Sequence, residues 1–220
     1  MSGLKLSPSD FAYLFEECKL CYWLKVKRGI YQPSMPMPGV FSAINTRLQT
    51  PLIGKELREV SSTLPPGRVV NQEGWVESIV LPGTNLFIKG KYDLLVDNGD
   101  GTHMLVDLKI SQADEGKIEK YQTQLSAYKY ALEHPASGQP IIISRMGLLI
   151  FYPDTVMFRD GTAQFTFPPT WLEVPADDER FLTFIRGVNE VLSGPVPQEN
   201  PSCKWCQYRH IGDQFAHQVS

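Results

Sequence analysis

Hydrophobic and polar positions recur with a clear period in several segments of this chain, and each period predicts a secondary-structure element. Residues 86–96 and 103–110 are rich in β-branched and aromatic residues and predict two strands. The intervening Asp-Asn-Gly-Asp-Gly segment, 97–101, supplies the glycines and Asx residues that a hairpin turn requires. We therefore expect two neighbouring antiparallel strands.

Further along the chain, the pattern predicts two more strands and two helices. Apolar runs predict strands over 140–153 and 163–174, the second broken by the proline pair at 168–169. One helix is predicted over 116–134. A second helix is predicted over 177–192, where the acidic residues at its start favour the positive end of the helix dipole.

The two ends of the chain carry weaker signals. Ser7 is a suitable N-cap with a proline directly after it, so we expect one helix that begins near Ser7 and delivers Cys18 and Cys21 one turn apart. The proline-rich segment 33–39 predicts a loop. The last residues, 211–220, are expected to be a frayed end.

Charged residues occupy one face of the second predicted strand. Side chains alternate between the two faces of a strand, so Asp107 and Lys109 point the same way and Leu108 points the other way. A charged pair on an otherwise apolar strand is unfavourable to bury unless it is paired or bound to a metal. Asp93 lies before the turn, and pairing across the hairpin brings its carboxylate near Asp107. Mg²⁺ and Mn²⁺ prefer such oxygen ligands, and the backbone carbonyl of Leu108 is a further candidate ligand.

This arrangement predicts metal-dependent cleavage of a phosphodiester. A divalent ion held by the two aspartates neutralises the charge on the phosphate oxygens and lowers the pKa of a bound water. Lys109 is placed to hold the attacking water and to stabilise the charge that develops. Gln124 and Tyr128 are one helical turn apart on the same face of the predicted helix. Together with Tyr121, they are candidates to contact a nucleic-acid backbone.

The cysteines form a second candidate site. All four lie in two Cys-x-x-Cys pairs near opposite ends of the chain: Cys18, Cys21, Cys203 and Cys206. Each pair brings two sulfurs to one ion, so the two pairs together complete a four-thiolate site for zinc or for an iron–sulfur cluster. The alternatives are two separate redox or disulfide pairs, or ordinary buried thiols. No signal peptide is recognisable, which favours one shared metal site in a reducing cytoplasm.

Composition and charge narrow the class of protein. With 220 residues, of which 42% are hydrophobic, the chain is expected to form one domain over residues 1–220. It has no P-loop, so any helicase would be a separate protein, and no apolar run long enough to cross a membrane. A net charge of −3 is not that of a strong electrostatic DNA binder, so local lysines are expected to make the DNA contacts. The candidates are Lys89, Lys91, Lys117 and Lys120.

Three short patterns in this order, G-x-x-D, D-x-K and Q-x-x-x-Y, resemble the PD-(D/E)XK nuclease superfamily, in particular the RecB-like branch that includes CRISPR-associated nucleases with four cysteines. In this chain the patterns are formed by Asp93, Asp107, Lys109, Gln124 and Tyr128. The resemblance covers residues 6–210. It implies an α/β fold with a mixed central sheet flanked by helices, a divalent metal at both aspartates, a catalytic lysine, and a helical extension of the site.

The chain departs from that branch in two places. Its members usually carry a histidine or an acidic residue on a helix before the hairpin as another metal ligand, and this chain has Asn45 there. An amide binds Mg²⁺ more weakly than a carboxylate does, so either the metal affinity is reduced or another residue, such as Glu77, takes the place of this ligand. Its four-cysteine relatives commonly have one cysteine near the start and three near the end, whereas this chain has two and two. Spacing alone slightly favours zinc, while the resemblance implies a 4Fe–4S cluster that clamps the first helix to the C-terminal tail.

We expect a metal-dependent deoxyribonuclease, either an exonuclease or an end-processing enzyme acting on single-stranded or frayed DNA. By resemblance, its setting is DNA repair, recombination or CRISPR adaptation, with a helicase or adaptation proteins as partners. Two alternatives come from other classes. One is a catalytically weakened DNA-binding module of the same fold, and the other is a structural or redox protein built on a thiolate-bound metal.

Overall fold

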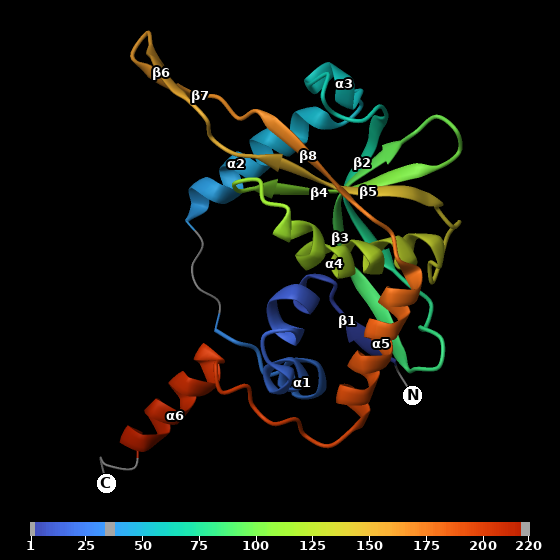
Figure 1. Cartoon of the computed structure of the whole chain (residues 1–220), viewed down its shortest axis with the longest axis vertical. Helices are drawn as coiled ribbons and strands as arrows, with labels where there is room; N and C mark the ends of the chain where they lie inside the picture. The colour runs from blue at the N-terminus through green and yellow to red at the C-terminus, as the bar shows by residue number, and fades with distance from the viewer. Residues whose placement is uncertain (1–2, 34–37, 217–220) are drawn as a thin grey trace.

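A mixed β-sheet lies at the centre of the molecule (Figure 1). The computed structural model describes residues 3–33 and 38–216. The strand order is β1-β3-β4-β5-β8, and β2 also pairs with β3. The strands β1 and β3, and likewise β4 and β5, run parallel, while the other neighbours are antiparallel. These strands are β1 (Leu4–Leu6), β2 (Arg68–Glu77), β3 (Leu86–Asp97), β4 (His103–Ile110), β5 (Ile143–Phe151) and β8 (Pro169–Val174).

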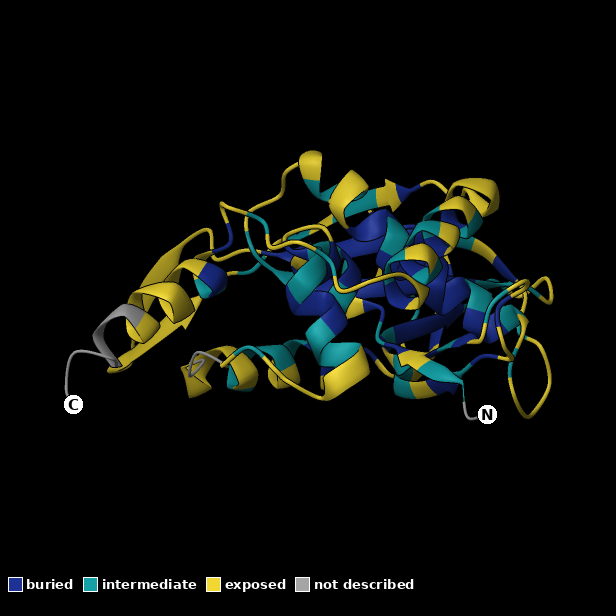
Figure 2. Cartoon of the chain, turned by 90° about the horizontal axis from the view of Figure 1, so that it is seen from below, coloured by how far each residue is buried: buried dark blue, intermediate teal, exposed yellow. Residues whose placement is uncertain are grey.

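Helices cover both faces of the sheet, which confirms the expected fold class. α4 lies across the face that is turned to the viewer in Figure 1 and shares the larger core with α1 and α5. α2, α3 and the short helix η2 lie over the other face, against a smaller core that includes Leu94 and Leu108. The buried centre and the exposed outer surfaces are separated clearly in Figure 2. The helices are α1 (Lys19–Arg28), α2 (Gly39–Gln49), η2 (Thr50–Leu52), α3 (Leu57–Val60), α4 (Gly116–Glu133), α5 (Asp178–Ser193) and α6 (Lys204–Ala216).

The hairpin and the two long helices form where the sequence pattern predicts them. β3 and β4 pair in antiparallel fashion around the Asx and glycine turn. In α5, the side chain of Asp177 accepts a hydrogen bond from the backbone N–H of Arg180 at 2.8 Å, which caps the helix. One apolar stripe of α5 is buried, as its period requires.

The start of the chain was predicted wrongly as one continuous helix. Within the predicted helix, Phe11–Phe15 form a separate π-helical turn, η1. The residues before it, Leu4–Leu6, form β1, for which no prediction was made. Cys18 has an extended backbone, with φ −159°, and precedes α1 as its N-cap. The extended residue breaks the helix because its dihedrals lie outside the α region.

The predicted frayed end was wrong for residues 211–216, because α6 continues to Ala216, and residues 217–220 lie outside the described part of the chain. Residues 207–213 of α6 are exposed, so no buried apolar face marks this part of the helix in the sequence. Of the predicted loop 33–39, residues 34–37 lie outside the described part of the chain, and Gly39 already belongs to α2.

The segment between β5 and β8 contains two further strands that form a hairpin. The sequence pattern predicted a single strand over 163–174, broken at the prolines 168–169, and so missed the first strand of this hairpin. β6 (Val156–Arg159) and β7 (Thr162–Phe165) pair with each other and project away from the main sheet (Figure 1). Both strands are exposed throughout. Among the described helices, none is long and apolar enough to span a membrane.

Candidate active site and four-cysteine site

The β3–β4 hairpin brings two aspartates and a lysine together. Asp93 accepts a hydrogen bond at Oδ2 from the backbone N–H of Leu108 at 2.8 Å, so its carboxylate lies against β4. The ammonium of Lys109 lies 2.6 Å from Asp107 Oδ2. The Leu108 side chain points to the opposite face and packs in the smaller core, as the two-residue period of a strand requires.

Helix α4 adds two polar side chains to the same place. Gln124 Nε2 donates to Asp107 Oδ1 at 3.2 Å, and both side chains are buried. Tyr128, one turn later on the same helix face, is buried near both carboxylates: burial raises its pKa above the usual value, and the charges of Asp107 and Asp93 raise it further. The structure thus places all five residues of the three sequence patterns around one point.

The charges at this point do not balance. Burial raises the pKa of Asp93 to about 7, and the neighbouring charge of Asp107 adds to the rise, while Lys109 and the N–H of Leu108 oppose it. Burial likewise raises the pKa of Asp107 against the opposing effect of Lys109. The pKa of Lys109 is raised because Asp107 and Asp93 outweigh its own burial. Two carboxylates share one ammonium, and an additional cation would stabilise both in their charged form.

The donor set fits a hard divalent ion. Asp107 is only 4% exposed, yet its Oδ2 accepts no hydrogen bond of normal geometry, despite the close ammonium of Lys109. Mg²⁺ is often held by one or two carboxylates and keeps several waters. Asp93 and Asp107 therefore suffice as its protein anchors, with the Leu108 carbonyl as a further candidate.

An open cavity of about 820 Å³ lies between α2, β2 and β3 and is lined by Asn45, Gln49, Glu73 and Lys91, among others. Asn45 stands on the predicted helix, and its amide donates to Gln49 Oε1 at 3.3 Å. Gln49 in turn donates to the backbone carbonyl of Asp93 at 3.0 Å. The amide of Asn45 is thus linked to β3 through a second amide.

Sequence reasoning missed Glu73, because it did not predict β2. The neighbours of Glu73 pair with Leu94 and Tyr92, so Glu73 lies opposite Asp93. Its backbone is left-handed, with φ 54°, and its carboxylate forms an ion pair with Lys91. The charge of Glu73 adds slightly to the raised pKa of Asp93, after the larger effects of burial and of Asp107. No local pattern marks this residue.

The candidate DNA-binding residues differ in their surroundings. Lys89 and Lys91 are paired with Glu77 and Glu73, and Lys117 donates to Ser111 Oγ at 2.8 Å. The remaining two candidates, Lys120 and Tyr121, lie beside Tyr13, a residue of η1 that sequence reasoning also missed.

We expect the replacement of Gly90 by Ala to lower the free energy of unfolding by about 1–3 kcal/mol. A Cβ at Gly90 would lie 2.9 Å from Tyr128 Cε1 and 3.0 Å from Pro8 Cδ, so the Tyr128 ring must move. Urea unfolding measures the change. Gly187→Ala on α5 is the control: nothing lies near its Cβ, and the alanine should raise stability slightly. Equal stability of the two variants would contradict the close approach.

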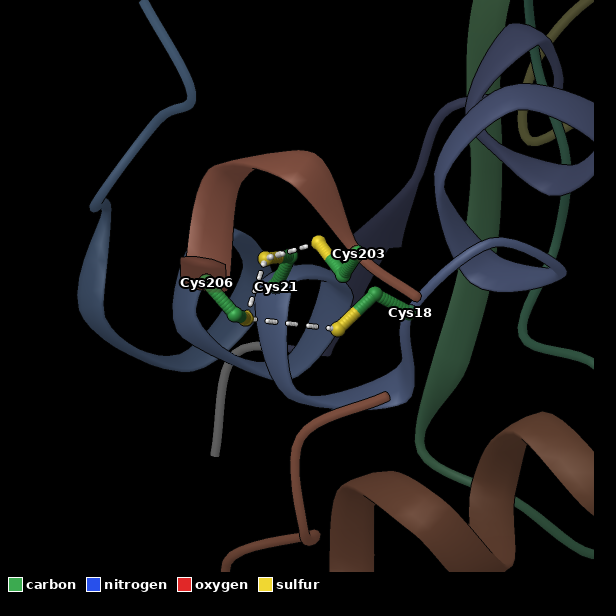
Figure 3. Close-up of side chains that lie close together, drawn as sticks. All are labelled: Cys18, Cys21, Cys203 and Cys206. Atoms are coloured by element: carbon green, nitrogen blue, oxygen red, sulfur yellow. Dashed lines mark hydrogen bonds between the residues drawn. The ribbon is translucent and has the colours of Figure 1, made fainter. Parts of the chain in front are cut away.

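The four cysteines come together as one cluster (Figure 3). Their sulfur atoms all lie within 4.8 Å of one another, and all four side chains are buried. The Sγ atoms of Cys18 and Cys206 are 3.8 Å apart, too far for a disulfide. Among the described residues, these cysteines are the one set of three or more ligating side chains close enough together to share an ion.

The environment of the cluster supports a bound cation. Burial raises the pKa of Cys18, but hydrogen bonds from the Asn200 and Cys21 backbones and from neighbouring thiols have the larger effect together. The net result is a pKa lowered to about 7. The pKa of Cys21 and that of Cys206 are raised, chiefly by burial. One thiolate is therefore favoured, and a metal is needed to stabilise the others. Arg209 Nη2 lies 3.5 Å from Cys206 Sγ and adds a positive charge.

Comparison with known proteins decides the family. A family model described as the PD-(D/E)XK nuclease superfamily matches residues 39–211. The chain belongs to the PD-(D/E)XK nuclease superfamily. Members of this superfamily are generally nucleases that cleave phosphodiesters, so the chain has a nuclease-type fold and a DNA substrate is implied. The matched segment contains all five pattern residues and the second cysteine pair, but it begins after the first pair.

Structure comparison finds a solved structure with a similar fold. The crystal structure of SSO0001 aligns with a TM-score of 0.53 and 16% sequence identity, covering 94% of this chain and 84% of that chain. At this identity the likeness shows the fold alone. None of the curated proteins searched has significant sequence similarity to this chain.

Proposed function

We propose that this PD-(D/E)XK protein is a Mg²⁺- or Mn²⁺-dependent deoxyribonuclease and that residues 1–220 work as one nuclease module in the cytoplasm. The observation that carries the proposal is the convergence of Asp93, Asp107, Lys109 and Gln124 on one point. The proposed catalytic group also includes Tyr128, and the proposed ion ligands are Asp93 and Asp107.

Each side chain has a distinct role in this proposal. The bound metal supplies charge neutralisation for the scissile phosphate and a more acidic water. Lys109, held by Asp107, orients the attacking water and stabilises the negative charge that develops on the phosphate. Gln124 holds Asp107 in position through its amide. Tyr128 closes the buried side of the site and keeps its phenol protonated, because burial raises its pKa.

For substrate, we propose single-stranded DNA or frayed DNA ends, cut as an exonuclease or during end processing. DNA repair, recombination and CRISPR adaptation are the proposed settings, with a helicase or adaptation proteins as partners. The resemblance to the RecB-like branch supports these finer assignments. For the cysteines, we propose a 4Fe–4S cluster in preference to zinc, with a structural role. The burial of all four cysteines supports that role.

The test is cleavage of DNA labelled at one end. We expect single strands and frayed duplexes to be cut with Mn²⁺ or Mg²⁺ and to stay intact in EDTA. Substrates blocked at both ends separate exonuclease from endonuclease activity, because an exonuclease spares them. Failure to cut any of these substrates with either metal would contradict the proposal.

Asn45 favours one second candidate, a DNA-binding module with weakened catalysis. Its amide stands where the related branch has a histidine or acidic ligand, and it is already hydrogen-bonded to Gln49. This candidate predicts binding of the same DNA without cleavage. Restoring an ionisable ligand by Asn45→His should then raise cleavage, whereas a fully active wild-type protein would exclude the candidate.

A further inference from the structure

Tyr13 is an exposed aromatic residue next to the proposed active site. It belongs to η1, a π-helical turn, and π-helical geometry is rare and frequent at functional sites. Its neighbours Phe11, Leu14 and Phe15 are buried in the larger core, whereas the Tyr13 side chain is 43% exposed. The core therefore holds the backbone of η1 in place while it presents this ring to solvent.

Tyr13 is connected to the charged pair through one side chain. Its hydroxyl is hydrogen-bonded to the hydroxyl of Tyr121, and the two ring centroids are 6.1 Å apart. The ammonium of Lys109 lies 4.6 Å from the centroid of the Tyr121 ring, and the same ammonium contacts Asp107. Only the Tyr121 side chain therefore lies between Tyr13 and the proposed catalytic lysine, Lys109.

A lysine accompanies the ring. Lys120 Nζ lies over the Tyr13 ring, 4.1 Å from the centroid, and because its side chain is exposed and flexible, it can leave that face when a base stacks there. Unlike Lys89, Lys91 and Lys117, it has no carboxylate or hydrogen-bond partner within residues 3–33 and 38–213. Its positive charge is therefore available to a phosphate next to the ring.

An exposed aromatic ring with a mobile ammonium close to it is a combination that binds single-stranded nucleic acids. The base stacks on the ring, and the cation binds the backbone. A base inside a duplex is already stacked on both sides, so it cannot use such a ring without first being released. The pair thus selects for an unpaired base.

We propose that Tyr13 and Lys120 form a platform on which one unpaired base of the substrate strand stacks, beside the phosphodiester that Asp107 and Lys109 act on. This inference rests on the proposed nuclease function and adds the residues that bind the single strand. Tyr13 contributes the ring, Lys120 contacts the adjoining phosphate, and Tyr121 connects the platform to the site.

The test compares Tyr13→Leu, Tyr13→Phe and Lys120→Gln with the wild-type protein on a single-stranded DNA that carries 2-aminopurine near its labelled end. Stacking on an aromatic ring quenches this base, so fluorescence in EDTA reports binding without cleavage, and kinetics with Mn²⁺ report kcat and KM. Tyr31→Leu is the matched control: Tyr31 is 68% exposed and has Lys25 Nζ 5.6 Å from its ring centroid. Tyr31 lines a different cavity, next to Cys21.

We expect Tyr13→Leu to raise both Kd and KM about tenfold, to remove most of the quenching and to change kcat less than threefold. Tyr13→Phe should behave like the wild type, because it keeps the ring, and Lys120→Gln should raise KM about threefold. Thermal midpoints of all variants show whether they are folded, and Lys120→Gln tests the platform even if Tyr13→Leu unfolds.

Two results would overturn the platform while leaving the nuclease function intact: a Tyr13→Leu protein that binds and cuts like Tyr31→Leu, or one that loses kcat at an unchanged KM. The second result would mean that Tyr13 acts only through Tyr121. A wild-type protein that neither binds nor cuts DNA would instead overturn the proposed function itself, and the platform with it.

Discussion

Asp107→Asn is expected to lower the rate of DNA cleavage by about 1000-fold. The substitution removes one of the two carboxylates proposed to hold the metal, and it also removes the partner that positions Lys109. Removal of one preorganised electrostatic group from an active site typically costs 10²–10³ in kcat, and here two functions of one side chain are lost together. Cleavage of end-labelled single-stranded DNA with Mn²⁺ gives the rate.

Lys109→Met should lower the rate by about 100-fold or more while leaving Mn²⁺ bound, because the lysine is not a ligand. A Mn²⁺ titration monitored by electron paramagnetic resonance distinguishes the two variants. Asp107→Asn should weaken metal binding, and Lys109→Met should leave it unchanged. Both changes disturb a buried charged group, so the thermal midpoint of each variant, compared with that of the wild type, serves as a folding check.

Asp100→Asn is the matched control for these changes. Asp100 lies in the turn of the same hairpin and accepts hydrogen bonds from Thr102, which an asparagine side chain can also accept. Its rate and its metal affinity should equal those of the wild type. Cleavage by Asp107→Asn at more than a tenth of the wild-type rate would show that the carboxylate pair is not the catalytic centre.

The second large effect is expected at the cysteine cluster. Cys206→Ser should release the bound metal and lower the thermal midpoint by about 10 °C, which corresponds to roughly 3 kcal/mol for a chain of this size. Helix α6 extends away from the rest of the molecule in Figure 1 and is coloured mostly as exposed in Figure 2. Within the described side chains of α6, Cys206 alone is buried. The thiolate cluster is therefore the main attachment of α6 to α1.

Gln207→Ser is the control for the cysteine variant, because Gln207 is the exposed neighbour of Cys206. It should keep both the metal and the midpoint of the wild type. Metal content and absorption identify the ion: a 4Fe–4S cluster gives brown protein with broad visible bands, and zinc gives colourless protein with one bound ion. Unchanged metal content and midpoint in Cys206→Ser would exclude a shared four-thiolate site.

Much of the candidate active site was predictable because it depends on local periods. The two-residue period of a strand places Asp107 and Lys109 on one face and Leu108 on the other. The helical period places Gln124 and Tyr128 together, and a turn of Asx residues and glycines sets the pairing of β3 and β4. These are properties of short segments, so the pattern in the sequence was sufficient.

Other features depend on contacts between distant segments, and the sequence pattern did not reveal them. Glu73 approaches Asp93 only because β2 pairs along β3, and Tyr13 reaches Tyr121 only because η1 lies against α4. The break before α1 was missed because the extended backbone of Cys18 is not marked by any glycine or proline.

By itself, the sequence determined the resemblance to the family, the hairpin, the helix that supports it and the number of cysteines. The tertiary structure decided that the two cysteine pairs form one site, since Cys21 and Cys203 are 182 residues apart in the chain and their sulfurs are 3.8 Å apart in space. It also decided which lysine stands beside an exposed ring and which lysines are neutralised by glutamates. The physical reason is that local periods encode which face of an element is buried, whereas the partner on that face is selected only when distant segments pack together.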